Sequence, residues 1–91
     1  MIQSFRHKGL KELFETGSSA KIPAELKQRC SDRLEILDAV IALEDLNLPG
    51  YQLHPLHGKQ VRYSIHVNGP WTMTFEWSAP DALRVDLEQY H

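Results

Sequence analysis

The fold is decided by residues 61–77, which read VRYSIHVNGPWTMTFEW. Apolar and polar residues alternate on both sides of Asn68-Gly69-Pro70, and this pattern is typical of two antiparallel strands joined by a tight turn. The apolar residues must share one face, because a slip of one residue would move Trp71 and Phe75 into water. The register that follows pairs Val67 with Trp71, His66 with Thr72, Ser64 with Thr74 and Arg62 with Glu76.

Two further strands are predicted on either side of this hairpin. After a turn at 78–81, residues 83–88 again alternate between apolar and polar, which indicates a third strand. Pairing Trp77 with Leu83 keeps its apolar residues on the same face as those of the hairpin. A shorter strand is predicted at 51–53, so the second half of the chain makes a sheet of about four strands.

The first half of the chain has a helical period instead. Leu10, Leu13 and Phe14 share one helical face, which predicts a short helix over 7–16 that ends at Gly17. A longer helix is predicted after Pro23 from an apolar stripe. This stripe consists of Leu26, Cys30, Leu34, Leu37 and Ile41 and is widened by Ile36, Val40 and Leu43.

These patterns predict a single α+β domain over 1–91, in which two N-terminal helices cover the apolar face of a small antiparallel sheet. The polar face is then left open to solvent or to a partner. Cys30 lies on the helical stripe, so we interpret it as a small core residue and not as a nucleophile. Chemistry is therefore expected on the polar face.

Composition limits the possible functions and the cellular location. The formal net charge is −2, so the chain lacks the overall positive field of a free-standing nucleic-acid binder. One cysteine cannot form an internal disulfide, and no apolar stretch approaches the ~18 residues of a membrane-spanning helix or resembles a signal peptide. We therefore expect a cytoplasmic protein that does not contact a membrane.

Histidines are concentrated near the polar face. The spacing His54-x-x-His57, with His66 or His91 as a third ligand, could hold zinc, but no cysteine or carboxylate pattern supports a metal site. Metal-free acid–base chemistry suits these residues better, because phosphodiester cleavage needs one group to accept a proton from a 2′-hydroxyl and another to protonate the leaving oxygen.

A cation near the scissile phosphate would stabilise the extra negative charge of the transition state. Arg62 and Arg84 both lie opposite Glu76 on the predicted register, so neutralisation of this carboxylate is favoured over a phosphate role, although exposed ion pairs are weak. Tyr63, Trp71 and Trp77 could stack on bases, but their strand parity places them on the buried face.

Several short motifs are spread over the whole chain. They comprise Met1-Ile2-x-Ser4-Phe5, His7-Lys8-Gly9-Leu10, Phe14-Glu15-Thr16-Gly17, Leu53-His54-Pro55-Leu56-x-Gly58, Tyr63-Ser64-Ile65-x-Val67-Asn68, Trp71-x-x-Thr74-Phe75 and Glu88-x-Tyr90-His91. Together these motifs are specific, and with them the sequence resembles the HigB-type killer toxins of the RelE superfamily.

The resemblance implies a RelE-like fold and a ribosome-dependent endoribonuclease that cleaves mRNA through the 2′-hydroxyl, without metal or other cofactor. The family's acid–base histidines fall on His54 and His91, and its substrate-orienting tyrosine falls on Tyr90. The implied partners are the ribosome with its mRNA and a cognate helix-turn-helix antitoxin of the HigA type, through which alone operator DNA would be contacted.

Three positions depart from the family's pattern. A lysine of the family is His57 here, which we count with the catalytic residues, an arginine is Thr72, and an aspartate is Gln89. Positive charge for the substrate could then come from neighbouring residues, and the predicted substrate-binding group is Lys59, Arg62, His66 and Thr72. The alternative is a catalytically impaired relative that acts only as an antitoxin-binding and transcriptional co-repressor module.

Overall fold

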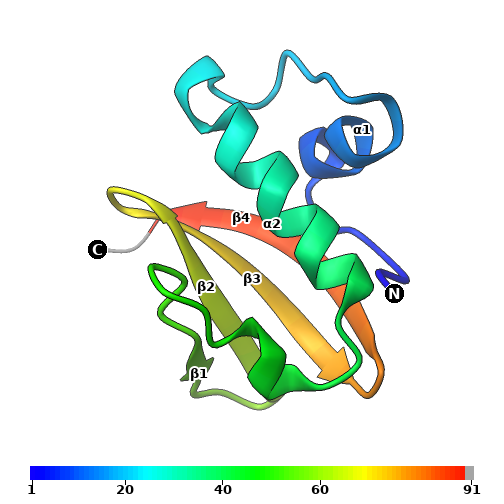
Figure 1. Cartoon of the computed structure of the whole chain (residues 1–91), viewed down its shortest axis with the longest axis vertical. Coiled ribbons are helices and arrows are strands. Elements are labelled where there is room, and N and C mark those ends of the chain that lie inside the picture. Colours follow the sequence, from blue (N-terminus) through cyan, green and yellow to red (C-terminus); the bar gives the residue numbers. More distant parts are fainter. Residues whose placement is uncertain (90–91) are drawn as a thin grey trace.

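The computed structural model describes residues 1–89, and its helices lie on one face of an antiparallel sheet (Figure 1). The two α-helices are α1 (Lys8–Thr16) and α2 (Lys27–Ala39), and two 3₁₀ turns are η1 (Ala24–Leu26) and η2 (Leu43–Leu46). The strands are β1 (His54–Leu56), β2 (Arg62–Asn68), β3 (Trp71–Ser78) and β4 (Asp81–Gln89), in the spatial order β1-β2-β3-β4. The α+β prediction is confirmed.

Helix α1 begins and ends with specific caps. The Nδ1 atom of His7 accepts a hydrogen bond of 3.1 Å from the Leu10 amide and so satisfies a free N–H group of the first turn. Gly17 closes the helix with φ +82°, and its N–H donates to the Leu13 carbonyl at 2.8 Å. The helix predicted over 7–16 is therefore confirmed, with His7 as its cap.

Most of the apolar stripe predicted for helix α2 is buried, but the helix ends before the last residue of the stripe. Leu26, Cys30, Leu34 and Leu37 are fully buried, whereas Ile41 is 74% exposed, so its assignment to the stripe was wrong. The helix ends at Ala39, and Val40 is extended with φ −72° and ψ 146°. Two adjacent β-branched residues at 40–41 favour this extended backbone.

The predicted register of the hairpin is confirmed along its length, with Arg62 opposite Glu76, Ser64 opposite Thr74 and His66 opposite Thr72. It is wrong only beside the turn. A β-bulge there places Asn68, and not Val67, opposite Trp71. The extra residue lets Val67 stay in the core while the chain reverses.

The predicted register between β3 and β4 was wrong by one residue beside the turn, where Trp77 pairs with Ala82 instead of Leu83. A second bulge between Thr74 and Glu76 shifts the pairing, and beyond it Thr74 lies opposite Asp86, as the predicted register requires. Arg84, in β4 beside this bulge, adopts φ +49°. The early strand was also misplaced, since β1 occupies His54–Leu56 and not 51–53.

The N-terminal segment covers the outer edge of β4. This pairing was not predicted from the sequence. Ile2 and Phe5 form parallel bridges with Ala82 and Val85, and the Gln3 N–H donates to the Ala82 carbonyl at 2.8 Å. A covered edge cannot pair with another chain, which removes a route to aggregation.

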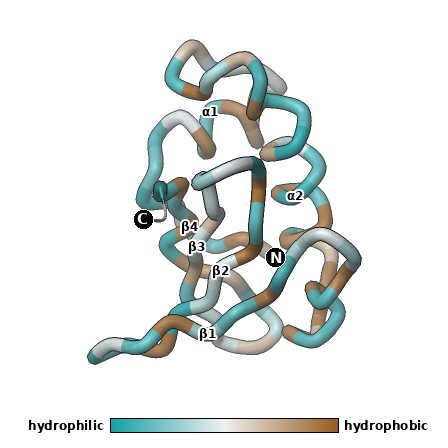
Figure 2. The backbone as a smooth tube through the Cα atoms, turned by 90° about the vertical axis from the view of Figure 1, so that its left-hand side faces the viewer, coloured by the Kyte–Doolittle hydropathy of each residue, from teal (hydrophilic) through white to brown (hydrophobic). Residues whose placement is uncertain are grey.

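The core lies between the helices and the inner face of the sheet. Tyr63 and Trp77 pack against Phe75, with ring centroids 6.1 and 6.5 Å apart, and Trp71 is also half-buried against the core. Their interpretation as core residues is confirmed. Figure 2 shows hydrophobic and hydrophilic residues alternating along the backbone. None of the helices in residues 1–89 is long and apolar enough to cross a membrane.

Candidate active site

A pocket of about 430 Å³ opens on the face of the sheet opposite the helices, and we call it the histidine pocket. It brings together three predicted site residues, His54, His66 and Thr72, from three different strands. The register explains this, because His54 lies opposite Ser64, and His66 lies opposite Thr72. Its lining consists of Gln52, His54, Ser64, His66, Gly69 and Thr72.

The floor of the pocket is polar and buried. Ser64 and Thr72 are only 5% and 9% exposed, although their strand parity predicted an open face. The Thr72 hydroxyl donates to the Glu88 carbonyl at 3.3 Å. His54 is exposed and His66 is half-buried, so a ligand in the pocket would meet imidazole rings above a hydroxyl-lined floor.

His66 is held by both its backbone and its ring. Its N–H donates to the Tyr51 carbonyl at 2.6 Å, and its own carbonyl accepts from Nε of Arg33 at 2.6 Å. The ring Nε2 lies 3.1 Å from the Gly69 carbonyl. A carbonyl can only accept, so this bond requires a proton on Nε2 and leaves Nδ1 available to a ligand.

Beside the pocket, Arg62, Thr74 and Glu88 form a hydrogen-bonded chain across three strands, which we call the Arg62 bridge. Nη2 of Arg62 donates to Thr74 Oγ1 at 2.8 Å and to Glu88 Oε2 at 2.5 Å, and the Thr74 hydroxyl donates to the same carboxylate. Arg62 lies opposite Glu76 as predicted, but the interpretation that it neutralises this carboxylate is wrong. Glu76 instead binds Arg84, whose Nη1 lies 2.7 and 2.8 Å from its two carboxylate oxygens.

The carboxylate of Glu88 is stabilised in its charged form. Partial burial raises its pKa, but hydrogen bonds from Thr74 and Arg62, together with the positive charges of Arg62 and Arg6, outweigh that effect. The pKa of Glu88 is therefore lowered from the ordinary carboxyl value. Sequence reasoning missed Glu88 and Arg6, and the signal that could have found Glu88 was its strand parity beside Thr72.

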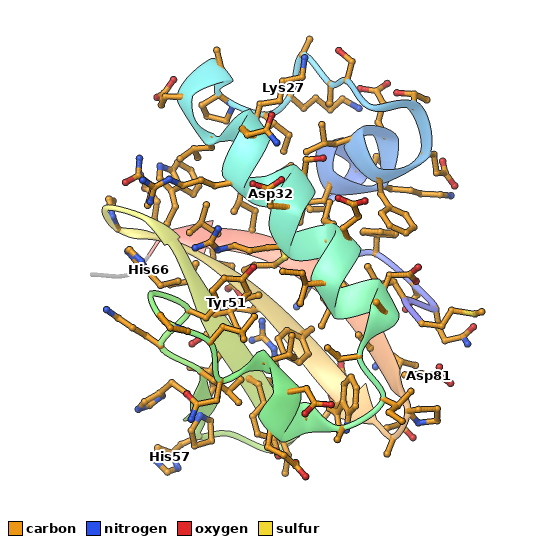
Figure 3. All side chains as sticks on the ribbon, viewed as in Figure 1. Lys27, Asp32, Tyr51, His57, His66 and Asp81 are labelled. Carbon is orange, nitrogen blue, oxygen red and sulfur yellow. The ribbon has the colours of Figure 1, made fainter. Side chains whose placement is uncertain are left out.

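The remaining predicted site residues in the described structure lie outside the histidine pocket. His57, Lys59 and Arg62 line a different hollow of about 420 Å³, and Figure 3 shows His57 well apart from His66. The structure thus separates the predicted site into two groups. Among the predicted site residues within 1–89, Arg62 connects them, because it lines the hollow while its guanidinium reaches Thr74 in the direction of the histidine pocket.

Tyr90 and His91 lie outside the described residues, so their convergence with His54 stays a prediction. Within residues 1–89, no group of three histidine, cysteine, aspartate or glutamate side chains is arranged to hold a metal ion. Cys30 is buried, and burial raises the pKa of its thiol to about 11 despite the nearby charge of Arg33. Its interpretation as a core residue is confirmed.

A four-stranded sheet with helices on one face and a histidine-lined pocket on the other defines a RelE-like protein. Residues 3–91 match the family of RelE-like toxins of the type II toxin–antitoxin system HigB, and the chain belongs to this family. The resemblance inferred from the motifs is thereby confirmed. Membership of a type II toxin–antitoxin family implies an antitoxin partner.

Two curated relatives span essentially the same length. The chain is 44% identical over 92 residues to the protein named Endoribonuclease HigB of Proteus vulgaris, with all of both chains covered. It is 31% identical over 93 residues to Toxin HigB-1 of Vibrio cholerae serotype O1, with 99% of this chain and 98% of the relative covered.

Proposed function

We propose that this toxin is an endoribonuclease that cleaves mRNA on the ribosome without a metal ion. The observation that carries the proposal is the histidine pocket, in which His54 and His66 stand over buried hydroxyl groups beside an arginine. The name of the Proteus vulgaris relative, which covers the whole chain, supports the reaction class.

In the proposed reaction, the 2′-hydroxyl of one nucleotide loses its proton to a base and attacks the adjacent phosphorus. The bond from phosphorus to the 5′-oxygen of the next nucleotide then breaks, and an acid protonates that oxygen. His54 and His91 are the proposed base and acid, and Tyr90 orients the substrate. An imidazole can serve as either the base or the acid in such proton transfers, so the proposed pair needs no metal.

Arg62 is the proposed source of positive charge for the transition state. Thr72 offers only a hydroxyl at its position, but Glu88, its partner across the strands, binds the Arg62 guanidinium. Partly exposed ion pairs are weak, so a phosphate could replace the Glu88 carboxylate on Arg62. Lys59, His57 and His66 are proposed to add further positive charge near the substrate.

The proposed partners follow from this activity. The ribosome presents the mRNA, and a helix-turn-helix antitoxin of the HigA type restrains the toxin and contacts operator DNA on behalf of the complex. Since translating ribosomes are the proposed target, the cytoplasm is the proposed place of action.

Substitution of His54 tests the proposal. We expect His54→Ala to lower the rate of mRNA cleavage on purified translating ribosomes by about 10²–10⁴, because a proton-transfer group is lost. The exposed Glu35→Ala on α2 is a matched control that keeps full activity. Primer extension on the mRNA measures the cleavage, and circular dichroism verifies the fold. Cleavage by His54→Ala at the wild-type rate would disprove the assignment.

A second candidate function is favoured by the Arg62 bridge itself. The arginine beside the histidine pocket, Arg62, is neutralised by Glu88, as expected of a chain that binds its antitoxin but no longer cleaves RNA. This alternative predicts that expression of the wild-type chain alone neither stops growth nor cleaves mRNA, while its complex with antitoxin still represses the operator. Growth arrest that His91→Gln abolishes would exclude it.

A further inference from the structure

We infer that the sheet carries a second site, which binds backbone phosphates of the RNA on one side of the scissile bond. The inference rests on the proposed function and extends it. Two adjoining hollows of about 450 and 420 Å³ share the residues Arg6, Gln60 and Arg62, and we call them together the arginine groove.

The groove gathers positive charge from separate parts of the chain. Four of the ten lysine and arginine residues line it, although the formal net charge of the whole chain is −2. Such local concentration in an acidic protein indicates a polyanionic ligand. The four come from the N-terminal segment, the loop before β2, β2 and β4, and they are Arg6, Lys59, Arg62 and Arg84.

Arg6 has a fixed backbone and an exposed side chain. Its N–H donates to the Val85 carbonyl at 2.9 Å, which fastens this residue beside β4. Among residues 1–89 its guanidinium makes no ion pair, but its charge contributes to the lowered pKa of Glu88. Arg6 thus lies in the same hollow as Arg62 and has donors left for a ligand.

Arg84 is aimed into the groove by the bulge of β4. Its backbone, at φ +49°, lies in a region that few side-chain-bearing residues adopt, and its N–H donates to Ser4 Oγ at 2.9 Å. The guanidinium contacts Glu76 through Nη1 alone. Because the side chain is 58% exposed, Nε and Nη2 can bind a phosphate while the ion pair with Glu76 stays intact.

The groove and the histidine pocket lie on the same face, on either side of the Arg62 bridge. Arg62 lines the groove, and its guanidinium binds Thr74 on β3. The residue opposite Thr74 on β2 is Ser64, which lies on the pocket floor. A strand of RNA with its scissile phosphate in the pocket would cross Arg62 and reach Arg6 and Arg84. The planar guanidinium donors match phosphate oxygens of any sequence.

Binding of a non-cleavable RNA tests the inference. The probe is a fluorescein-labelled, fully 2′-O-methylated single-stranded 12-mer, and its anisotropy is followed at several KCl concentrations. We expect Arg6→Gln/Arg84→Gln to weaken binding at least tenfold in low salt and to lower the slope of log K against log salt by about 1.4, or 0.7 for each lost phosphate contact. Arg84→Lys, which keeps the charge, should retain most of the slope.

The matched control is Lys11→Gln/Lys21→Gln, which removes the same charge from exposed positions on α1 and the loop that follows. We expect it to leave the slope unchanged, and an equal loss in this control would overturn the inference, since binding would then report only net charge. Wild-type protein without salt-dependent binding would also overturn it. So would groove variants that bind the RNA normally but lose affinity for the antitoxin, because the groove would then serve a protein partner.

The catalytic role proposed for the histidine pocket is tested independently of the groove. His54→Ala should bind the 2′-O-methyl RNA with the wild-type slope and still lose cleavage on the ribosome. If groove variants bind normally while His54→Ala loses cleavage, the groove is wrong and the proposed catalysis stands. If the groove variants lose binding and His54→Ala cleaves normally, the groove stands and the catalytic assignment is wrong.

Discussion

At the scale of single residues, the most informative side chain is Glu88. Its carboxylate binds both Thr74 and Arg62, so it fixes the arginine beside the histidine pocket and also neutralises it. The same contact thus positions a cation for phosphate and competes with the phosphate for it. The contribution of Glu88 to stability can be measured by changing the pH and by substituting this residue.

The lowered pKa of Glu88 predicts a pH dependence of stability. A carboxyl whose pKa is lower in the folded than in the unfolded state contributes stability that is fully present above the unfolded value, near 4.5, and is lost as the pH falls through the folded value. We expect a loss of up to about 1 kcal/mol, as for partly exposed ion pairs. Urea unfolding at pH 6 and below pH 4 measures it.

Glu88→Gln should remove this part of the pH dependence, because glutamine does not titrate. Glu35→Gln on the exposed face of α2 is the matched control and should retain it, since Glu35 forms no ion pair within residues 1–89. Equal pH profiles for Glu88→Gln and the wild type would show that the Arg62 bridge contributes nothing to stability.

Arg62 and Thr72 yield a paired prediction for activity. Arg62→Gln should slow mRNA cleavage on ribosomes by about 10²–10³, the usual cost of a lost transition-state donor. Adding Thr72→Arg should recover part of this loss, because position 72 lies directly on the pocket floor. Single-turnover cleavage rates measure both effects, with Lys11→Gln at an exposed position of α1 as the control. A fully active Arg62→Gln variant would show that another residue supplies the positive charge for the transition state.

At the scale of elements, helix α2 fixes the wall of the histidine pocket through two arginines. Arg33 is 8% exposed, donates to the His66 carbonyl at 2.6 Å and lies 4.4 Å from the centre of the Tyr51 ring. Arg29 donates to the next carbonyl, that of Val67, at 3.2 Å. Together they satisfy the backbone at the bulge, where ladder partners are displaced.

Arg33→Met should destabilise the protein by about 2–4 kcal/mol, because it removes a charged hydrogen bond to a half-buried carbonyl and a cation–π contact. Arg29→Met, at an exposed position, should cost less than about 1 kcal/mol. Denaturant unfolding measures both. NMR of the His66 ring should change in Arg33→Met but not in Arg29→Met, and similar costs for the two variants would contradict the role given to Arg33.

Elements with a strict period could be predicted from the sequence, and irregular ones could not. Alternation fixed the pairing of His66 with Thr72, because any slip would have exposed Trp71 and Phe75. A bulge leaves the alternation intact on each side, so the shift near Arg84 gave no signal. The separation of His57 from the histidine pocket was equally invisible, since it depends on the path of a loop.

At the scale of the whole molecule, one face of the sheet forms the core and the other carries the proposed site. The helices cover one face of the sheet (Figure 1), where the large aromatics join the core, while His54, His66, Arg62 and Arg84 line hollows on the other face. This layering followed from the sequence, because both apolar periods require a shared interior. The charge distribution did not, since a formal net charge of −2 hides the arginine groove.

The parallel contact between the N-terminal segment and β4 also constrains when the fold can be completed. The amide of Arg84 binds the hydroxyl of Ser4 across 80 positions of the chain. A contact of such long range closes a large loop of intervening chain, which costs conformational entropy. A nascent polypeptide that has emerged only as far as β3 has Arg6 but neither Arg84 nor Glu88. The N-terminal segment therefore meets its strand partner only after translation has passed β4.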